Sequence, residues 1–380
     1  MPVFSFATAT AIRFGRGEAA HAVGWIAGFG RRVLLVTGAT PERSGWLFDG
    51  LRDEGCEVSP YSVAGEPDLA MVEAGVLQAR AARAGVVVAI GGGAVIDAGK
   101  AIAALAPATR PAMDHLEVVG RGLPLERAPL PFFAIPTTAG TGAEVTRNAV
   151  IAVPEHRRKV SLRDAKMLPD LAIVDAALTD GCPRPITLAS GLDAITQVIE
   201  PYICTRANPL TDALCRDTIP RGAAALRRLM EAEDAGARDE MAWVSLCGGL
   251  ALANSGLGVV HGLAGPLGGL SGAAHGAICG VLLPHALALN ERRTDSPEVA
   301  RRIAEIRRWI AAALGCDTGA AFAVLARWSR ENGLPGLDAL GISPEDRRLA
   351  AAAAAVSSSM AANPAALDAG DLVALMEAAR

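Results

Sequence analysis

The feature that most constrains the fold is the alternation of short apolar runs with helical patterns in the first 180 residues of this 380-residue chain. Apolar runs rich in Val, Ile and Leu, separated by helices, are typical of a parallel sheet covered on both faces. We expect helices at about 45–55, 67–84 and 95–106, and segment 3–15 should form a separate hairpin or an edge strand. The expected strands are VLLVTG at 33–38, EVSPYSV at 57–63, VVVAIGGG at 86–93, FFAIPTT at 132–138 and LAIVD at 171–175.

From about residue 180 the pattern changes to long segments rich in Ala, Leu and Arg, with no convincing strand. Examples are 221–235, 300–314 and 346–360, which we expect to be helices. The chain also exceeds the length at which a single hydrophobic core stops growing. The sequence therefore predicts an α/β domain with a Rossmann-like parallel sheet at 1–180 and an all-helical domain at 181–380.

Composition excludes several classes of protein. Hydrophobic residues make up 51% and charged residues 20% of the chain, and the formal net charge is −4, as in an ordinary globular protein. Scattered basic residues and few aromatic ones argue against a nucleic-acid partner, and we expect neither a signal peptide nor a membrane span. The seven cysteines are irregularly spaced and include no C-x-x-C pair. They are expected to be reduced, which predicts a cytoplasmic protein.

A glycine-rich turn follows the expected strand at 86–93. Gly91, Gly92 and Gly93 leave bare backbone N–H groups where a helix begins, and such a helix N-terminus can bind a phosphate. The run matches neither G-x-G-x-x-G nor a P-loop, and a plain tight turn is an equal alternative.

A second loop follows the next expected strand and contains Thr137, Thr138 and Thr141 among glycines. A threonine hydroxyl there could cap a helix, or could complete a phosphate and ribose site. Two such loops at the carboxyl ends of parallel strands favour a bound dinucleotide.

Two of the six histidines, His261 and His275, lie fourteen residues apart in a run of Gly, Ala, Leu and Pro. Asp193 and Gln197 are four residues apart in a helical pattern and therefore share one apolar face, where a carboxylate needs a partner. A divalent metal would suit these oxygen and nitrogen donors. The alternatives are a helix-capping or ion-paired Asp193 and histidines that simply hydrogen-bond to backbone.

These motifs carry a family resemblance. From residue 3 to about 375 the chain resembles the iron-containing (group III) alcohol dehydrogenases, whose fold is shared with dehydroquinate synthase. The matching runs are GGGAVIDAGK at 91–100, IPTTAGTGAEVT at 135–146, LPDLAIVD at 168–175, SGLDAITQVIEPY at 190–202, NSGLGVVHGLAGPLGG at 254–269 and AHGAICGVLLPH at 274–285.

The resemblance implies an N-terminal NAD(P)-binding domain, a helical domain carrying the metal, and hydride transfer in the cleft between them. It implies Fe²⁺ as the ion, with Zn²⁺ as the alternative, an alcohol and aldehyde pair as substrate, and a homodimer or larger homo-oligomer. Asp193, His261 and His275 are the implied catalytic residues, and with Gln197 they form the metal set. The cofactor-binding set is Gly38, Gly91, Gly92, Gly93, Asp97, Thr137, Thr138, Thr141 and Lys159.

The chain departs from the family pattern at two positions of this site. Gln197 stands where the family has a metal-binding histidine, and a neutral amide oxygen is a weaker ligand for iron than imidazole. Gly265 stands where the family often has another histidine near the substrate, so the alcohol proton would need water, a cofactor hydroxyl or another histidine. Gly265 also leaves room for a larger substrate.

The choice of coenzyme depends on the residue after the first nucleotide-binding strand. Gly38 occupies the place where NAD-preferring members of the family often have an acidic residue, and Arg43 follows five residues later. This arrangement would tolerate the 2′-phosphate of NADP, although Gly38 could simply form the turn and Arg43 could be a solvated loop charge.

The sequence is also compatible with three other functions. The closest is a metal-independent enzyme resembling maleylacetate reductase. A lyase of the dehydroquinate synthase type and a binding protein without catalysis are the others.

Overall fold

The computed structural model describes residues 3–355 and 357–380. The chain separates into two compact units, one helical and one with an α/β fold. The α/β unit comprises residues 7–138 and 142–179. The helical unit comprises residues 180–380 together with 139–141 and the described N-terminal residues through Phe6.

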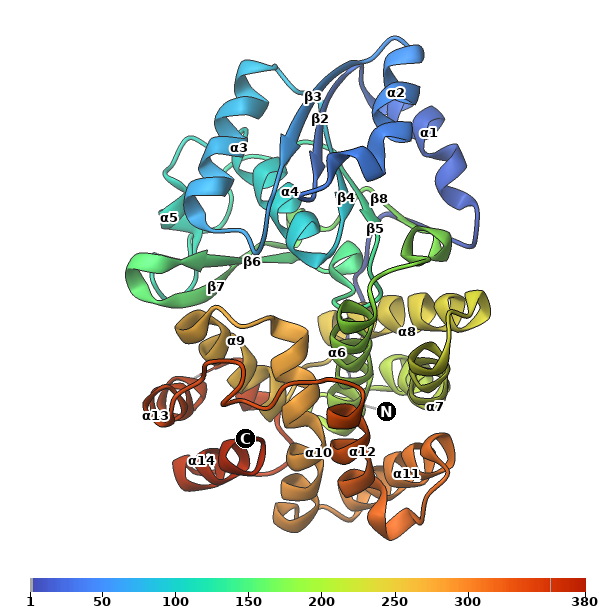
Figure 1. The fold of residues 1–380 in the computed structure, drawn as a ribbon. Coiled ribbons are helices and arrows are strands. Elements are labelled where there is room, and N and C mark those ends of the chain that lie inside the picture. Colours follow the sequence, from blue (N-terminus) through green and yellow to red (C-terminus); the bar gives the residue numbers. More distant parts are fainter. Residues whose placement is uncertain (1–2, 356) are drawn as a thin grey trace. The chain divides into compact units, whose positions relative to one another are not determined.

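The α/β unit is built on a parallel sheet with the strand order β1-β8-β5-β4-β2-β3 (Figure 1). Every pairing in this sheet is parallel, as the near-continuous apolar runs predict. The strands are β1 (Ala11–Phe14), β2 (Arg32–Thr37), β3 (Glu57–Ser62), β4 (Val86–Gly91), β5 (Phe132–Pro136) and β8 (Leu171–Val174). The helices are α1 (Ala22–Phe29), α2 (Gly45–Asp53), α3 (Leu69–Ala81), α4 (Gly93–Leu105) and α5 (Ala112–His115).

Helices cover both faces of this sheet, and strand β2 shows how the two cores are divided. Val33 and Leu35 belong to a core that they share with residues of α1 and α2. Leu34 and Val36 belong to the opposite core, with residues of α3 and α4. Successive side chains of a strand point to opposite faces, so a strand buried on both faces must be apolar at every position.

Of the two alternatives expected for segment 3–15, a hairpin or an edge strand, the edge strand is confirmed. This strand is β1, which pairs in parallel with β8. The antiparallel hairpin formed by β6 (Asn148–Val153) and β7 (Arg158–Arg163) was not predicted from the sequence.

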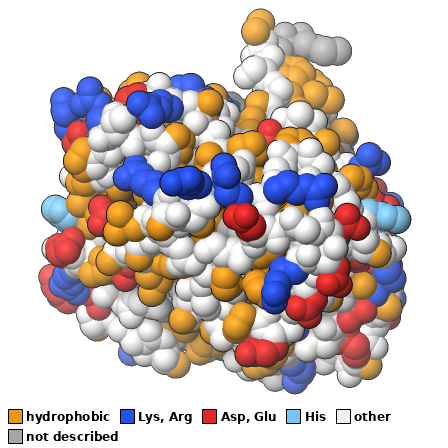
Figure 2. Space-filling model, turned by 90° about the horizontal axis from the view of Figure 1, so that it is seen from above, with side chains coloured by type: hydrophobic (Ala, Val, Ile, Leu, Met, Phe, Trp, Pro, Cys, Tyr) orange, Lys and Arg blue, Asp and Glu red, His pale blue; other side chains and the backbone are white. Residues whose placement is uncertain are grey.

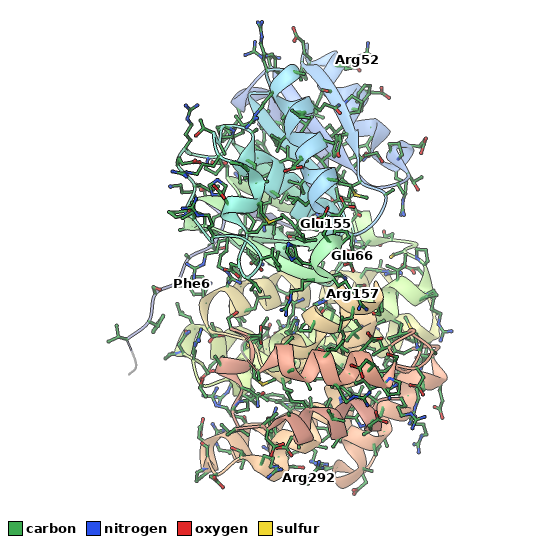
Figure 3. The ribbon with its side chains drawn as sticks, turned by 90° about the vertical axis from the view of Figure 1, so that its left-hand side faces the viewer. Phe6, Arg52, Glu66, Glu155, Arg157 and Arg292 are labelled. Atoms are coloured by element: carbon green, nitrogen blue, oxygen red, sulfur yellow. The ribbon has the colours of Figure 1, made fainter. Side chains whose placement is uncertain are left out.

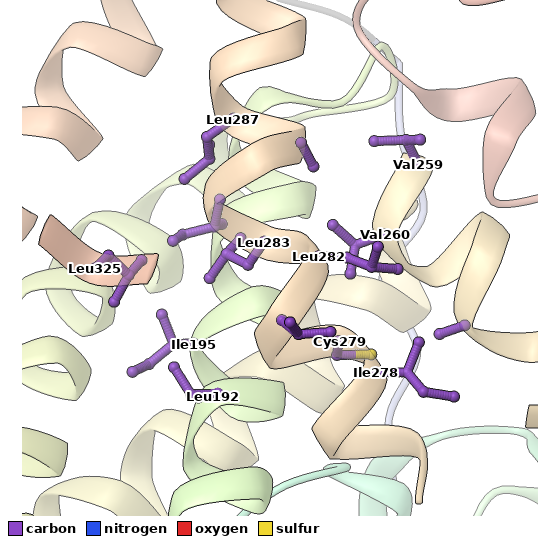
Figure 4. Packing of buried hydrophobic residues seen from close by; sticks show 14 of the residues in the cluster. Leu192, Ile195, Val259, Val260, Ile278, Cys279, Leu282, Leu283, Leu287 and Leu325 are labelled. Atoms are coloured by element: carbon purple, nitrogen blue, oxygen red, sulfur yellow. The ribbon is translucent and has the colours of Figure 1, made fainter. Parts of the chain in front are cut away.

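The described residues of the second unit form helices and connecting segments and include no strand, as predicted for the chain beyond residue 180. Its helices are α6 (Arg184–Ile203), α7 (Pro209–Glu231), α8 (Ala235–Asn254), α9 (Val259–Ser271), α10 (His275–Arg293), α11 (Pro297–Leu314), α12 (Ala321–Glu331), α13 (Pro344–Ala354) and α14 (Ala369–Ala378). Helix α6 packs against α7, α8 and α10, and apolar side chains of α6, α9 and α10 form the centre of the core (Figure 4).

Two helix boundaries differ from the prediction for this unit. The expected helix at 221–235 spans the junction of α7 and α8, where Asp234 caps the second helix by accepting a hydrogen bond from the Ala237 N–H. The expected helix at 346–360 ends earlier, because α13 stops at Ala354.

All seven cysteines are free, as expected for a reduced protein. Among the described residues no single helix is both apolar and long enough to cross a bilayer. Two bent pairs, α8 with α9 and the α11–α12 region, pass that test by length and composition only. Figure 2 shows basic and acidic side chains interspersed with apolar ones on the face in view.

Candidate functional site

Helix α6 places three polar side chains on one buried face. Asp193, Gln197 and Glu200 follow one another at intervals of four and three residues, so they lie in line along the helix. They are only 2%, 2% and 4% exposed, respectively. Burying two carboxylates on an apolar helix is costly unless each has a partner, so their surroundings indicate what they do.

The first turn of α10 lies directly against α6 because of a glycine. A Cβ atom added at Gly276 would lie 2.6 Å from the Ala189 carbonyl oxygen and 3.4 Å from the Asp193 Cβ. Only glycine allows this approach, which brings the neighbouring His275 to the Asp193 carboxylate. His261 comes from the first turn of α9.

The structure brings Asp193, His261 and His275 together, with Cys279 as a fourth member. One donor atom from each of these residues lies within 4.8 Å of the others. The Asp193 Oδ1 is 3.5 Å from the His261 Nε2 and 3.8 Å from the His275 Nε2. We call these four residues the donor cluster.

Glu200 fixes the orientation of His261. Its carboxylate accepts hydrogen bonds from the Val260 N–H at 2.7 Å and from the His261 Nδ1 at 2.6 Å, with the His261 backbone N–H at 3.4 Å. With Nδ1 acting as the donor, the lone pair of His261 is on Nε2, which faces Asp193. The same carboxylate satisfies N–H groups at the start of α9, so it serves both the helix and the imidazole.

Three buried polar atoms on this face have no hydrogen-bond partner among the described residues: Asp193 Oδ1, Gln197 Oε1 and His261 Nε2. Buried polar atoms are nearly always paired, so an unpaired group of this kind calls for an explanation. The Gln197 amide donates to the Gly140 carbonyl oxygen at 3.1 Å, which leaves its own oxygen as the acceptor without a donor. Two oxygens and a nitrogen that offer only lone pairs fit a cation.

The electrostatics of the donor cluster agree with this interpretation. Burial raises the pKa of Asp193, but the adjacent His275 and His261 outweigh burial and hold it below its usual range. Burial lowers the pKa of His275, yet Cys279 and Asp193 raise it to about 9, and the pKa of His261 is likewise raised. The negative potential that raises the pKa of the two imidazoles would also attract a divalent cation, and binding it would displace the proton from His261 Nε2.

A second group of candidate residues lies at the carboxyl edge of the sheet in the α/β unit. The chain runs from β2 outward to β3 and then returns past β2 to β4, so the strand order reverses between β2 and β4. Gly38 follows β2 and Gly91 ends β4, on either side of this reversal, where open α/β sheets bind their ligands.

The glycine turn and the threonine loop meet at this edge. The Thr137 N–H donates to the Gly91 carbonyl oxygen at 2.9 Å, and a Cβ added at Gly92 would lie 3.3 Å from the Thr138 Oγ1. Gly93 begins helix α4, and no side chain within the described ranges caps that helix. A Cβ at Gly91 would lie only 2.6 Å from the Val95 side chain, so this turn requires glycine.

The remaining predicted cofactor residues have other partners. Asp97 Oδ2 accepts a hydrogen bond from the Val150 N–H at 3.0 Å, which ties α4 to β6. Lys159, on β7, forms an ion pair with Glu66, which Figure 3 labels. Thr141 is grouped with the helical unit, and not with Thr137 and Thr138.

A buried amine fastens the segment after the threonine loop to α4. The Lys100 Nζ donates to the Ala143 carbonyl oxygen at 2.6 Å, to the Thr146 Oγ1 at 2.9 Å and to the Asn148 carbonyl oxygen at 2.9 Å. Burial lowers the pKa of Lys100 to about 8. Burial also raises the pKa of the neighbouring Glu144 to about 7.

Sequence reasoning missed Glu200, Cys279 and Lys100. Glu200 lies seven residues after Asp193, on the same helical face, and Cys279 lies four after His275, so helical periodicity offered a signal for both. Lys100 was inside a motif already quoted, but nothing local shows that its amine is buried.

Comparisons with known proteins agree with the fold and the motifs. The family model described as iron-containing alcohol dehydrogenase matches residues 9–176, and the one for the C-terminal part of the Fe-containing alcohol dehydrogenase family matches residues 187–380. Alcohol dehydrogenase 4 of Schizosaccharomyces pombe is 35% identical over 338 residues, covering 87% of this chain and 77% of that protein. Lactaldehyde reductase of Escherichia coli is 36% identical over 282 residues, 73% of each chain.

Among solved structures, one described as 1,3-propanediol oxidoreductase superposes with a TM-score of 0.88 at 30% identity, and the match covers 100% of both chains. The two family models together account for nearly all of the sequence, and both curated relatives exceed 30% identity over more than two thirds of it. The chain therefore belongs to the iron-containing alcohol dehydrogenase family.

Proposed function

We propose that this chain, an NAD(P)-dependent oxidoreductase acting on an alcohol and its aldehyde or ketone, uses the donor cluster to hold a divalent metal and the glycine turn to hold the coenzyme. The observation that carries the proposal is the convergence of Asp193, His261 and His275, with Asp193 Oδ1 and His261 Nε2 buried and lacking a hydrogen-bond partner among the described residues. Gln197 Oε1 offers a further oxygen. A divalent cation bound there supplies Lewis-acid polarisation of the substrate oxygen.

The protein's own residues determine how such an ion is held. Asp193 provides the negative charge, and the imidazoles of His261 and His275 provide neutral nitrogen donors. Glu200 keeps the His261 ring in the tautomer that directs Nε2 toward Asp193. The side chain of His275 is 33% exposed, whereas that of Asp193 is only 2% exposed, so we place the substrate on the His275 side of the cluster.

Gly265 lies one turn after His261 on α9 and leaves space for the substrate. A Cβ added there would meet no heavy atom within 4 Å. We propose that this space accepts the carbon chain of a small or medium-sized alcohol, and that the alcohol proton leaves through water or a coenzyme hydroxyl. The named relatives, an alcohol dehydrogenase and a lactaldehyde reductase, act on compounds of this class.

We assign the coenzyme's pyrophosphate to the N-terminus of α4, where Gly92 and Gly93 expose backbone N–H groups next to Thr138. When the alcohol is oxidised, the nicotinamide accepts the hydride from its carbon and one proton is released; when the carbonyl is reduced, the nicotinamide supplies the hydride and one proton is taken up. Gly38, which we place near the ribose, has no carboxylate that would repel a 2′-phosphate. Arg43 follows five residues later in the chain and is exposed to solvent. We therefore propose that NADP is accepted as well as NAD. Asp97, Thr137, Thr141 and Lys159 remain candidates for this site.

We propose that the reaction depends on a metal, Fe²⁺ or Zn²⁺, unlike the reaction of a maleylacetate reductase-like enzyme. A metal-independent enzyme would have no use for unpaired, buried oxygen and nitrogen donors. The family match likewise favours an alcohol dehydrogenase over a dehydroquinate synthase-type lyase.

Metal analysis combined with turnover tests the proposal. Protein purified without chelator should contain bound divalent metal, and His261→Ala should lose both metal and turnover, because one nitrogen donor is gone. Gln197→His should bind iron more tightly, because imidazole replaces a neutral amide oxygen. Titration with NADH and NADPH, followed by fluorescence, tests the coenzyme site separately. Unchanged metal content and turnover in both variants would contradict the metal role.

We also propose that the chain acts in the cytoplasm as a homodimer or larger homo-oligomer. Seven free cysteines support a reducing compartment. Val3, Phe4 and Phe6 are 102%, 40% and 38% exposed in the N-terminal segment, where Figure 3 labels Phe6, and exposed apolar side chains of this kind favour a second chain as partner. Light scattering of wild type and a Phe4→Ser/Phe6→Ser variant would test self-association.

A further inference from the structure

Cys279 occupies a position that packing alone does not explain. It is fully buried on α10, among apolar side chains of α6, α9 and α10 (Figure 4). Its Sγ, however, lies 3.5 Å from the His275 Nε2, one helical turn away, and belongs to the group of donor atoms that all lie within 4.8 Å of one another. A cysteine that served only as a small apolar residue would not need polar donors around its sulfur.

Three separations between donor atoms lie close to the values expected for ligands in a tetrahedral site. With zinc bond lengths of about 2.3 Å to sulfur and about 2.0–2.2 Å to nitrogen and oxygen, tetrahedral ligands should be separated by about 3.6 Å (S to N) and about 3.3–3.5 Å (N to O). Ligands at right angles, as in an octahedral site, would be only about 2.9–3.1 Å apart. The observed separations are 3.5 Å for Cys279 to His275, and 3.5 and 3.8 Å for Asp193 to the two histidines.

We propose that the Cys279 sulfur is a metal ligand, which makes the site an Asp-His-His-Cys set that selects zinc over iron. The inference rests on the proposed metal role of the donor cluster and identifies the ligand that compensates for Gln197. A thiolate is a much stronger donor to zinc than a neutral amide oxygen. The Gln197 amide is held by the Gly140 carbonyl, so its oxygen becomes a secondary contact and not the fourth ligand.

The partial exposure of His275 leaves this set accessible. The Asp193, His261 and Cys279 side chains are at most 7% exposed, and only the His275 side chain, at 33%, reaches solvent. A zinc site with protein ligands on its buried side can expand its coordination on the open side, where the substrate oxygen would approach.

Cobalt substitution tests the sulfur ligand without relying on activity. The metal-free protein is loaded with Co²⁺, and absorption is recorded in the near ultraviolet, where only a thiolate ligand produces an intense sulfur-to-cobalt band. Wild type should show the band. Cys279→Ala should lose it and bind Zn²⁺ at least about tenfold more weakly, because a direct ligand should matter at least as much as an outer-shell partner.

The matched control is Cys215→Ala, which removes another fully buried thiol in the same unit, and Cys279→Ser is a nearly isosteric second variant. Cys215→Ala should keep the band, Cys279→Ser should lose it, and Gln197→Ala should keep it. X-ray absorption of the zinc form should show one sulfur at about 2.3 Å. Thermal unfolding of the metal-free variants establishes that each one is folded.

The outcomes separate this inference from the proposed function. If wild type binds Co²⁺ without a sulfur band, or if Cys279→Ala keeps the band, then Cys279 is not a ligand, although the metal role of the cluster stands. If wild type binds neither Co²⁺ nor Zn²⁺, or if His261→Ala binds both as tightly as wild type does, then the proposed metal role fails and the Cys279 ligand with it.

Discussion

Replacing Glu200 with glutamine should weaken metal binding although Glu200 is not itself a ligand. The substitution keeps the shape of the side chain but turns one acceptor oxygen into an NH₂ donor. In the structure both oxygens are used, one by the Val260 N–H at 2.7 Å and the other by the His261 Nδ1 at 2.6 Å. Glutamine can accept from only one of them, so a buried donor loses its partner.

Two magnitudes follow from this geometry. An unpaired buried N–H group should lower the free energy of unfolding by about 1–3 kcal/mol. Losing the carboxylate that orients a ligand histidine should also weaken metal binding about 10–100-fold, or about 1.4–2.7 kcal/mol. Both effects should appear in the same variant because one carboxylate serves both the start of α9 and the imidazole.

Two measurements separate the effects. Competition with a chromophoric chelator gives the Zn²⁺ dissociation constant, and urea unfolding of the metal-free protein gives the stability. As a control, Glu305→Gln removes a carboxylate that hydrogen-bonds Tyr202, and should leave the dissociation constant unchanged. A Glu200→Gln variant that is destabilised but binds Zn²⁺ with wild-type affinity would refute the positioning role.

Three further predictions, one of them with a control substitution, test other parts of the molecule. Glu144→Gln should remove a pH dependence of stability. Because the pKa of buried Glu144 is raised to about 7, the wild type should lose about 2 kcal/mol relative to the variant as the pH rises from about 5 to 7, measured by urea unfolding across that range. Gly99→Ala should destabilise the protein by about 1–3 kcal/mol in thermal or urea unfolding, because its Cβ would lie 2.6 Å from the Ala89 Cβ. The exposed helical Gly28, with nothing within 4 Å of an added Cβ, should instead tolerate alanine or gain about 0.5–1 kcal/mol. Gly92→Ala should weaken NADH binding about tenfold in a fluorescence titration with little loss of stability, and unchanged affinity would move the pyrophosphate away from this turn.

The parallel sheet was predictable because its signal is local. Each central strand is apolar at nearly every position, and only burial on both faces permits that composition. The β6–β7 hairpin was missed for the opposite reason. Arg158–Arg163 is charged at both ends, and it pairs with Asn148–Val153 through a turn that contains no Asn-Gly or Asp-Gly signal.

The donor cluster was predictable only in part. Helical spacing placed Asp193 and Gln197 on one face, but bringing His261 and His275 to that face needed the family resemblance, since a single sequence does not show how three helices pack. Cys279 was considered only as one of seven reduced cysteines, because the proximity of its sulfur to His275 matters only once Asp193 approaches from another helix. Glu200 was missed because its partners on α9 lie sixty residues farther along the chain.

The Lys100 amine has a consequence for how the proposed coenzyme site would respond to its ligand. Three hydrogen bonds from one ammonium join α4 to the chain after β5, so moving that chain relative to the helix would break charge-assisted contacts in a dry interior. The segment from Ala143 to Asn148, which follows the threonine loop, is therefore held on α4 before any nucleotide arrives. Coenzyme should then bind to a preorganised segment, so that the protein loses little conformational entropy on binding. The association rate should be set by diffusion and orientation and not by a change in the conformation of the protein.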